Sequence, residues 1–173
     1  MAKGRFIPIN PAKYVGNPNN IFFRSSWELT VLKFFDKSNA VIRYASEEIV
    51  VPYVSPKDGK VHRYFPDFYV ELINAQQVIE KWLVEVKPLK ETDHQFAKTV
   101  YDKMAVAINE AKWNAAKKFC SMNGLQFKVI TELDIYKMDP TKKNKMLNRT
   151  NSTKKSINSK KTKPSTKVRS IKK

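Results

Sequence analysis

The sequence contains little that would crosslink it or anchor it to a membrane. Its single cysteine, Cys120, can form no intramolecular disulfide and no cysteine-based zinc cluster, which fits a reducing cytosol. No apolar run approaches the roughly 20 residues of a membrane-spanning helix, and no signal peptide opens the chain. With 42% hydrophobic residues, the chain has enough apolar side chains for one domain with a core. We therefore expect a protein that is neither secreted nor membrane-bound.

Acidic residues are scarce, and the last part of the chain has none. Residues 141–173 contain thirteen Lys or Arg and no Asp or Glu, in a chain whose formal net charge is +17. This tail also has too few apolar side chains to offset the entropy of ordering, so the sequence predicts that it is disordered. Its charge density suits attraction to phosphate, and nucleic acid is the expected partner, ahead of an acidic membrane. The alternative is an extension that only improves solubility.

The start of the chain predicts an arm followed by a helix. Residues 1–23 are rich in Pro, Asn and Gly, which indicates an irregular arm that lies across the domain. A helix is expected from Ser25 to about Asp36, because Ser25 and Glu28 have the spacing of a capping box and an apolar stripe follows.

Three strands are predicted next in the chain. The first two flank a hairpin loop in which Asp58-Gly59 is a strong turn signal. Pro66 interrupts the second strand, because proline cannot donate a hydrogen bond to a strand ladder. The predicted strands are residues 41–54, 61–72 and 78–87.

A long helix and a fourth strand complete the expected domain, which covers residues 24–140. The helix is predicted from Thr99 to Asn123, the fourth strand includes residues 127–130, and a short helix begins near Thr131. This order predicts an α/β domain with a mixed four-stranded sheet flanked by helices. The expected core stripe of the long helix is Met104, Ile108, Ala111, Ala115 and Met122.

Two neighbouring strands carry residues that suit metal-dependent chemistry. Asp67 follows a proline, and Glu85 and Lys87 stand two residues apart on the next strand, so these two side chains share a face. If the strands are neighbours, two carboxylates and one ammonium meet at one point. Two carboxylates can hold a hard divalent cation, which lowers the pKa of a water molecule and stabilises charge on a phosphoryl oxygen. The pattern therefore favours cleavage of a phosphodiester.

Each of these residues also has an ordinary structural interpretation. Asp67 can simply open a turn, and Glu85 and Lys87 can form the solvent face of a half-exposed strand. Glu28 can do no more than cap its helix. The apolar residues around Glu85 instead indicate a buried strand, in which two charged groups need a reason.

The order of the elements and these residues resemble the PD-(D/E)xK nuclease superfamily, and most closely the head-completion nucleases of T4-like tailed phages. The transposon end-cleaving nucleases of the Tn7 type share the same core pattern. The Lys-rich tail is not part of the resemblance. The strings that carry the closer resemblance lie within residues 24–88: Arg24-Ser25-Ser26-Trp27-Glu28, Ser46-Glu47-Glu48, Ser55-Pro56-x-Asp58-Gly59, His62-Arg63-Tyr64-Phe65-Pro66-Asp67-Phe68 and Leu83-Val84-Glu85-Val86-Lys87-Pro88.

The resemblance implies a restriction-endonuclease-like core and assigns a catalytic role to four residues. Asp67 and Glu85 match the metal-binding carboxylates, Lys87 matches the superfamily's lysine, and Glu28 matches its first-helix acid. The metal would be Mg²⁺ or Mn²⁺, with the carbonyl of Val86 as a third ligand. Lys87 would orient the attacking water or stabilise charge on the phosphorus, and it would act as a general base only if its pKa were lowered.

Further basic residues near these motifs are candidates for contacts with DNA. They are Arg24, Arg63 and Lys90, together with Lys112 on the long helix, where the neighbouring Trp113 is expected to pack. The resemblance also implies phage head, neck or portal proteins as partners, in the host cytoplasm during assembly or in the virion. The oligomeric state and the form of the DNA substrate stay open, since a monomer that cuts one strand and a dimer that cuts two both fit.

The favoured interpretation is a Mg²⁺-dependent DNA endonuclease that acts in phage head completion after DNA packaging. One alternative is a structural protein of the virion head or neck that binds DNA without cutting it, although all four site residues are retained. The other alternative is a transposon or restriction-type endonuclease.

Deletion of residues 141–173 is expected to make the slope of log DNA affinity against log salt concentration less steep by several units. The reason is that each neutralised phosphate adds about −0.9 to the slope of log affinity against log salt. Fluorescence anisotropy of a labelled duplex over a salt series measures this slope for the full chain and for the deletion. An unchanged slope would show that the tail does not bind DNA and would favour an acidic protein surface as its partner.

Overall fold

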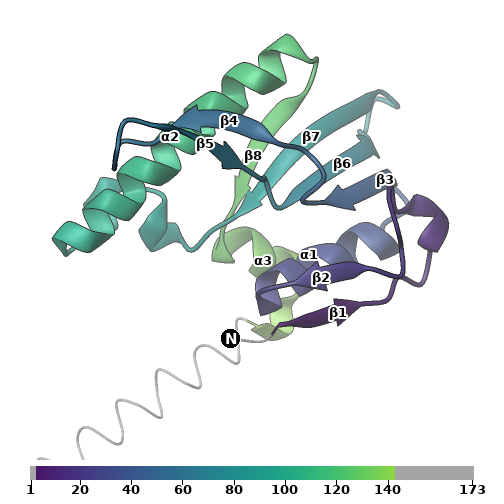
Figure 1. Ribbon diagram of the computed structural model, residues 1–173. Helices are drawn as coiled ribbons and strands as arrows, with labels where there is room; N and C mark the ends of the chain where they lie inside the picture. The colour runs from purple at the N-terminus through teal and green to yellow at the C-terminus, as the bar shows by residue number, and fades with distance from the viewer. Residues whose placement is uncertain (1–2, 143–173) are drawn as a thin grey trace, which may run out of the picture. The chain divides into compact units, whose positions relative to one another are not determined.

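A four-stranded sheet lies at the centre of the computed structural model, which describes residues 3–142 (Figure 1). The strand order is β3-β6-β7-β8, with β6 antiparallel to both β3 and β7, and with β7 parallel to β8. The predicted mixed four-stranded sheet is therefore confirmed. Its strands are β3 (Val41–Ser46), β6 (Phe68–Ile73), β7 (Ile79–Val86) and β8 (Gln126–Ile130).

The sheet and its helices belong to one compact unit, residues 1–138. Of the residues that follow this unit, 139–142 are described. Apart from its first two residues, the tail predicted to be disordered lies outside the described residues.

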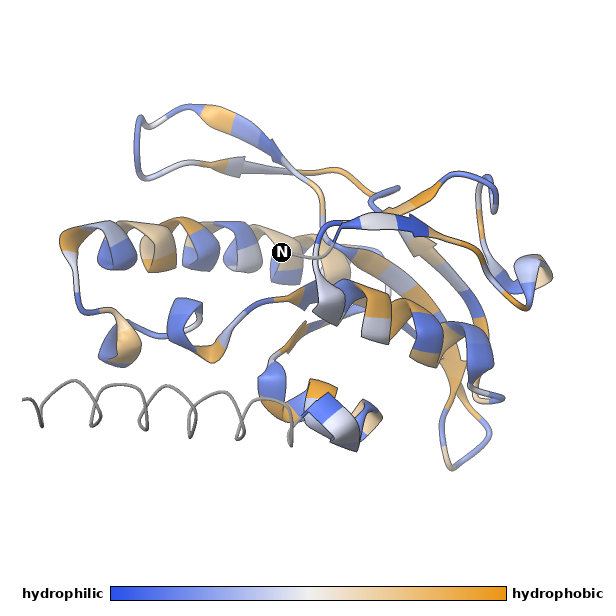
Figure 2. Ribbon diagram, turned by 90° about the horizontal axis from the view of Figure 1, so that it is seen from below, coloured by the Kyte–Doolittle hydropathy of each residue, from blue (hydrophilic) through white to orange (hydrophobic). Residues whose placement is uncertain are grey.

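Helices cover both faces of the sheet. On one face, α1 (Ser26–Lys37) and α3 (Glu132–Met138) contribute to a buried cluster with the strands. On the other face, α2 (Val100–Met122) packs together with a hairpin of β4 (Val51–Val54) and β5 (Val61–Tyr64). Figure 2 shows hydrophobic and hydrophilic residues alternating along both long helices. Each helix thus buries one apolar stripe against the sheet and exposes a polar face.

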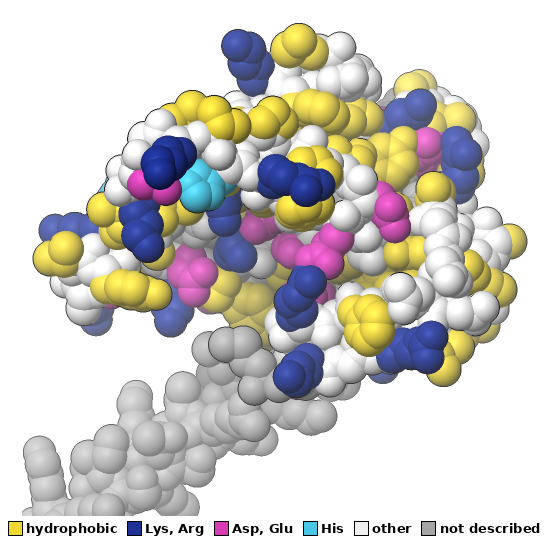
Figure 3. Space-filling view, in the orientation of Figure 1, with side chains coloured by type: hydrophobic (Ala, Val, Ile, Leu, Met, Phe, Trp, Pro, Cys, Tyr) yellow, Lys and Arg dark blue, Asp and Glu magenta, His cyan; other side chains and the backbone are white. Residues whose placement is uncertain are grey.

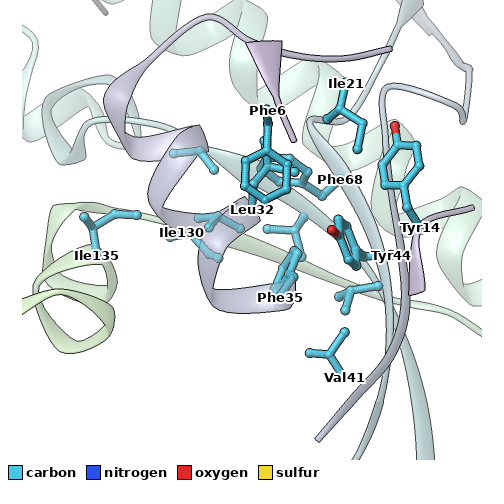
Figure 4. Packing of buried hydrophobic residues seen from close by; sticks show 14 residues of the cluster. Phe6, Tyr14, Ile21, Leu32, Phe35, Val41, Tyr44, Phe68, Ile130 and Ile135 are labelled. Carbon is cyan, nitrogen blue, oxygen red and sulfur yellow. The ribbon is translucent and has the colours of Figure 1, made fainter. Parts of the chain in front are cut away.

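Aromatic side chains fill the core beneath α1 (Figure 4). The ring of Phe35 on α1 lies 5.8 Å from that of Phe68 and 6.1 Å from that of Tyr44, measured between centroids. Both sheet residues are almost completely buried. These contacts fix α1 over β3 and β6, and so they fix where the helix lies relative to the start of β6.

Both long helices begin and end close to the predicted positions. Ser25 and Thr99 cap α1 and α2 with their side-chain oxygens, and Asn123 is the C-cap of α2. The predicted core stripe of α2 is wrong at both ends, because Met104 and Met122 are 43% and 76% exposed. The buried residues of α2 are Val106, Asn109, Trp113, Ala116 and Cys120, so Trp113 packs as predicted.

Within residues 3–142, no helix is both long enough and apolar enough to cross a membrane.

The two long strands predicted over residues 41–54 and 61–72 are each broken into two. Glu47 has a left-handed backbone conformation, with φ 55°, and turns the chain out of β3. Pro66, which has no N–H, lies between β5 and β6. The outer halves, β4 and β5, pair only with each other among the described strands. The break is favourable because the hairpin buries Val51, Tyr53 and Tyr64 in the cluster with α2 instead of extending the sheet.

The N-terminal arm, predicted to be irregular, contains a small antiparallel sheet instead. β1 (Gly4–Phe6) pairs with β2 (Ile21–Phe23), and a 3-10 turn, η1 (Pro11–Lys13), lies between them. The strands are short and far apart in the sequence, so no local pattern reveals their pairing. The arm does lie across the domain as predicted, because Tyr14 bridges to Tyr44 of β3 and is buried in the core beneath α1.

A buried carboxylate at the end of α1 holds the arm in place. The Asp36 side chain is 1% exposed and accepts hydrogen bonds from the backbone N–H groups of Ile9 and Asn10, at 2.8 and 3.0 Å. The hydroxyl of Tyr44 donates to the same carboxylate at 3.3 Å. The amide of the Asn10 side chain donates to the Asp36 carbonyl at 2.8 Å. One acidic residue therefore joins the arm, the helix and β3.

Replacing Asp36 with Asn should lower the free energy of unfolding by about 1–3 kcal/mol, because the new NH₂ group cannot accept from both backbone N–H groups. Urea denaturation followed by circular dichroism measures this loss. Asp58→Asn, in the exposed hairpin turn, is the matched control and should have a much smaller effect. Equal stability of the two variants would contradict an anchoring role for Asp36.

Candidate active site

The last residues of β7 point their charged side chains toward α2 and the hairpin. Leu83 packs in the cluster on this face, and Glu85 lies two residues further along the strand. The Glu85 side chain is buried, and its Oε1 lies 3.3 Å from Nζ of Lys87, whose side chain is 29% exposed. The alternate residues, Val84 and Val86, pack in the core beneath α1. The predicted shared face of Glu85 and Lys87 is therefore present.

Asp67 reaches the same place from the residue just before β6. Its Oδ2 accepts a hydrogen bond of 2.7 Å from the backbone N–H of Val86. Phe68 pairs with Val84, so a continued ladder would set Val86 opposite Pro66. The carboxylate of Asp67 thus provides the Val86 N–H with an acceptor where the regular ladder ends. This bond places the acids of two strands beside each other.

The environment of Asp67 favours its protonated form. Burial and the nearby charge of Glu85 raise the pKa of Asp67 to about 7, although the hydrogen bond from Val86 and the charge of Lys87 act in the opposite direction. Glu28 also raises this pKa, so the first-helix acid is electrostatically coupled to Asp67. A cation bound here would offset the repulsion from Glu85, which is the second cause of the shift after burial.

Lys87 has the opposite electrostatic character. Burial lowers the pKa of the Lys87 ammonium, but the carboxylates of Glu85 and Asp67 outweigh this effect, so the pKa is raised. Lys87 is therefore a protonated donor at neutral pH in this arrangement. As a donor, it can orient a water molecule or stabilise a negative charge.

Tyr64 and Lys112 join the site from the hairpin and from α2. The hydroxyl of Tyr64 donates a hydrogen bond of 2.7 Å to Oε2 of Glu85, so the two oxygens of this carboxylate face a phenol and an ammonium. Nζ of Lys112 lies 5.6 Å from the centre of the Tyr64 ring. The sequence predicts no role for Tyr64, because no motif indicates that its strand leaves the central sheet and carries the tyrosine to Glu85. For Lys112, the sequence predicts only a contact with DNA.

Glu28 lies in the first turn of α1. Its backbone N–H donates to Oγ of Ser25 at 3.1 Å, and its Oε2 accepts from the backbone N–H of Arg24 at 2.7 Å. Half of the predicted capping box is therefore present, while the carboxylate binds the residue before the cap. The half-buried Glu28 combines a structural contact with its coupling to Asp67.

The other basic residues proposed to contact DNA are spread over the surface. The guanidinium of Arg24 pairs with the carboxylate of Glu47, whose backbone N–H donates to the Asp67 carbonyl at 3.2 Å. Arg63 is exposed on β5 and lies over the ring of Phe65, 5.0 Å from its centre. Lys90 is exposed on η2 (Leu89–Glu91). Arg24 is therefore connected through Glu47 to the residue before β6, whereas Arg63 and Lys90 are exposed elsewhere on the surface.

The oxygen atoms at this place suit a hard divalent cation. Within residues 3–142, no three His, Cys, Asp or Glu side chains form a metal-binding group. Two carboxylates remain, Asp67 and Glu85, beside the last peptide of β7 at Val86. Mg²⁺ uses few protein carboxylates and keeps several waters, so this sparse oxygen set fits it better than it fits zinc. Figure 3 shows acidic side chains in a hollow on one face, with Lys and Arg side chains around them.

Comparison with known proteins connects this arrangement to nucleases. Residues 38–132 match the family described as "TnsA-like endonuclease N terminal". The chain is also 31% identical over 142 residues to the protein named "Head completion nuclease" of Enterobacteria phage T4. This alignment covers 75% of this chain and 90% of that protein. No solved structure matches the chain. The family match includes Asp67, Glu85 and Lys87, whereas Glu28 precedes it.

Asp67→Asn is expected to stabilise the metal-free protein at pH 8. The pKa of Asp67 is about 7 in the folded protein and 3.8 ordinarily, so the folded state binds the proton more tightly than the unfolded state does. The resulting stability is fully present below 3.8 and is lost as the pH rises through about 7. Asparagine has no charge to bury, so the gain at pH 8 should be about 1–3 kcal/mol and should shrink toward pH 4.

Thermal unfolding of both proteins in EDTA at pH 4 and pH 8 measures this gain. Asp58→Asn provides a control of opposite sign, because a backbone hydrogen bond from Lys60 and a bond from His62 lower the pKa of Asp58. A destabilising effect of Asp67→Asn at pH 8 would contradict the electrostatic strain inferred for this carboxylate.

Proposed function

This chain belongs to the family of TnsA-like endonucleases that is defined by their N-terminal domain, and on that premise we propose that Asp67 and Glu85 hold the divalent metal ion with which it hydrolyses phosphodiester bonds in DNA. The observation that carries the proposal is the hydrogen bond from the Val86 N–H to the Asp67 carboxylate, which sets Asp67 beside the end of β7, where Glu85 pairs with Lys87. Carbonyl oxygen from Val86 is the proposed third protein ligand. Mg²⁺ is the proposed ion, with Mn²⁺ as the alternative, because all donors are oxygen atoms.

Each residue of the proposed site has a distinct task. A divalent ion supplies the lowered pKa of a water molecule and the polarisation of a phosphoryl oxygen. Lys87, as an ammonium, donates to the attacking water or to a phosphoryl oxygen on which negative charge develops. Tyr64 holds the Glu85 carboxylate in one orientation through its hydroxyl. Glu28 adds negative charge near Asp67 and contacts the ion directly or through water.

The surrounding cations are proposed to guide the DNA backbone to these acids. Arg24 is connected to the residue before β6 through its pairing with Glu47, and it can exchange that carboxylate for a phosphate. Arg63 and Lys90 are exposed and are proposed to contact phosphates further along the duplex. The tail, residues 141–173, adds attraction to DNA that does not depend on sequence.

The proposed setting is phage head completion after DNA packaging. The support is the relative named "Head completion nuclease", of which this chain covers 90%. Head, neck or portal proteins are the partners that this setting implies, in the host cytoplasm during assembly or in the virion. The alternative is a DNA-binding structural protein of the head or neck that does not cut.

Nicking of supercoiled plasmid tests the proposal most directly. Wild-type protein should nick with Mg²⁺ or Mn²⁺ and should be inactive in EDTA. Asp67→Asn and Lys87→Ala should each reduce the rate at least about 100-fold, because each removes a group needed to place or stabilise the reacting charge. Glu110→Gln, an exposed change on α2, should cut at the wild-type rate.

The outcomes separate the alternatives. Equal nicking by all variants would indicate a contaminating nuclease or a different site. No nicking by any protein, with DNA binding intact, would favour the structural protein that holds DNA without cutting it. Loss of binding together with cleavage in Asp67→Asn would show that Asp67 has a folding role.

A further inference from the structure

Lys112 occupies an unusual position between the hairpin and the acids. Its Nζ lies 5.7 Å from the centre of the Tyr53 ring and 5.6 Å from that of Tyr64. These tyrosines come from β4 and β5, and both side chains are more than nine-tenths buried against α2. A cation over two aromatic faces is attracted by the negative charge of their π-systems. The hairpin thus holds the lysine head in a defined place.

The ammonium of Lys112 has no acidic partner within residues 3–142. Its contacts there are the two rings, and it is only half-buried. Burial lowers its pKa, while the charge of Glu85 raises it and the charge of Lys87 lowers it. The three charges are therefore close enough to act on one another. Aromatic faces leave the three N–H donors of the ammonium without a strong acceptor, which is unfavourable unless water or an anion provides one.

Lys87 and Lys112 differ in what they contact. Lys87 pairs with Glu85 at 3.3 Å, so it belongs to the immediate surroundings of the acids. Lys112 makes no ion pair with Glu85 and instead lies over the ring of Tyr64, whose hydroxyl binds that carboxylate. The two ammonium groups therefore stand at different distances from the acids. One phosphate held at the acids would engage Lys87 and would leave Lys112 for a neighbouring phosphate.

We infer that Lys112 is a DNA-binding residue of the cleavage site, which donates to the phosphate next to the one that is cut and is held in position by the rings of Tyr53 and Tyr64. This inference rests on the proposed function, because it takes the acids as the point of cleavage. It assigns the inner face of the β4–β5 hairpin a part in substrate binding. Tyr64 then serves two groups, Glu85 through its hydroxyl and Lys112 through its ring.

Binding of a short labelled duplex in EDTA, over a salt series, tests the phosphate contact without any cleavage. Lys112→Met keeps the aliphatic stem and removes the charge. It should weaken binding about three- to tenfold and reduce the salt slope by about 1, as expected for the loss of one phosphate contact. Lys112→Arg should keep the wild-type slope. Lys117→Met, an exposed change on the same helix, is the matched control. It should change both the affinity and the salt slope by less than Lys112→Met does.

Variants of the two tyrosines test whether their rings position Lys112 for DNA binding. Tyr53→Leu should weaken DNA binding in the wild-type background and have little further effect in Lys112→Met, because both changes remove one interaction. Tyr64→Phe keeps the ring and loses only the hydroxyl bond to Glu85. It should leave the salt slope unchanged while it weakens metal binding, measured by calorimetric titration with Mn²⁺.

Two results would overturn the inference. The first is a salt slope for Lys112→Met equal to that of Lys117→Met. The second is a Lys112→Met variant that binds Mn²⁺ more tightly with an unchanged slope, which would mean that Lys112 only balances the charge of the acids. Either result would leave plasmid nicking by the wild-type protein intact. Failure of the proposed function would instead appear as no nicking by the wild type, whatever the slopes are.

Discussion

The hydrogen bond from the Val86 amide to the Asp67 carboxylate is the contact on which the candidate site depends. It replaces a ladder bond at the point where β6 and β7 separate, and it sets Asp67, the residue before β6, beside the end of the strand that carries Glu85. Without it, Asp67 would be a polar residue in a loop beside a proline. With it, the carboxylates of Asp67 and Glu85 stand together in a partly buried place, where like charges are unfavourable unless a cation joins them.

The remaining contacts of the site compensate for this unfavourable arrangement. Lys87 brings one positive charge to Glu85, and Tyr64 donates to the other oxygen of the same carboxylate. Burial and the charge of Glu85 nevertheless keep the pKa of Asp67 raised, against the effects of the Val86 hydrogen bond and of Lys87. Under the proposed function, the stability that this arrangement lacks in the metal-free protein would become affinity for a divalent ion.

The β4–β5 hairpin connects this chemistry to a second layer of the protein. It exists because the chain leaves the central sheet at Glu47 and returns to it after Pro66. The excursion carries Tyr53 and Tyr64 onto α2 and lays their rings against Lys112. The same breaks in the strands that interrupt the regular sheet therefore assemble the side of the site that faces α2.

The sequence by itself determined the order of the elements, the mixed sheet, both long helices with their caps, and the shared face of Glu85 and Lys87. These features follow from local rules: hydrophobic period, capping residues and the alternation of side chains along a strand. Only the tertiary structure decided the arm sheet, the separate hairpin, the buried face of α2, and the contacts of Tyr64 and Lys112. Each of these depends on which distant surfaces pack together, and short-range patterns carry no record of such partners.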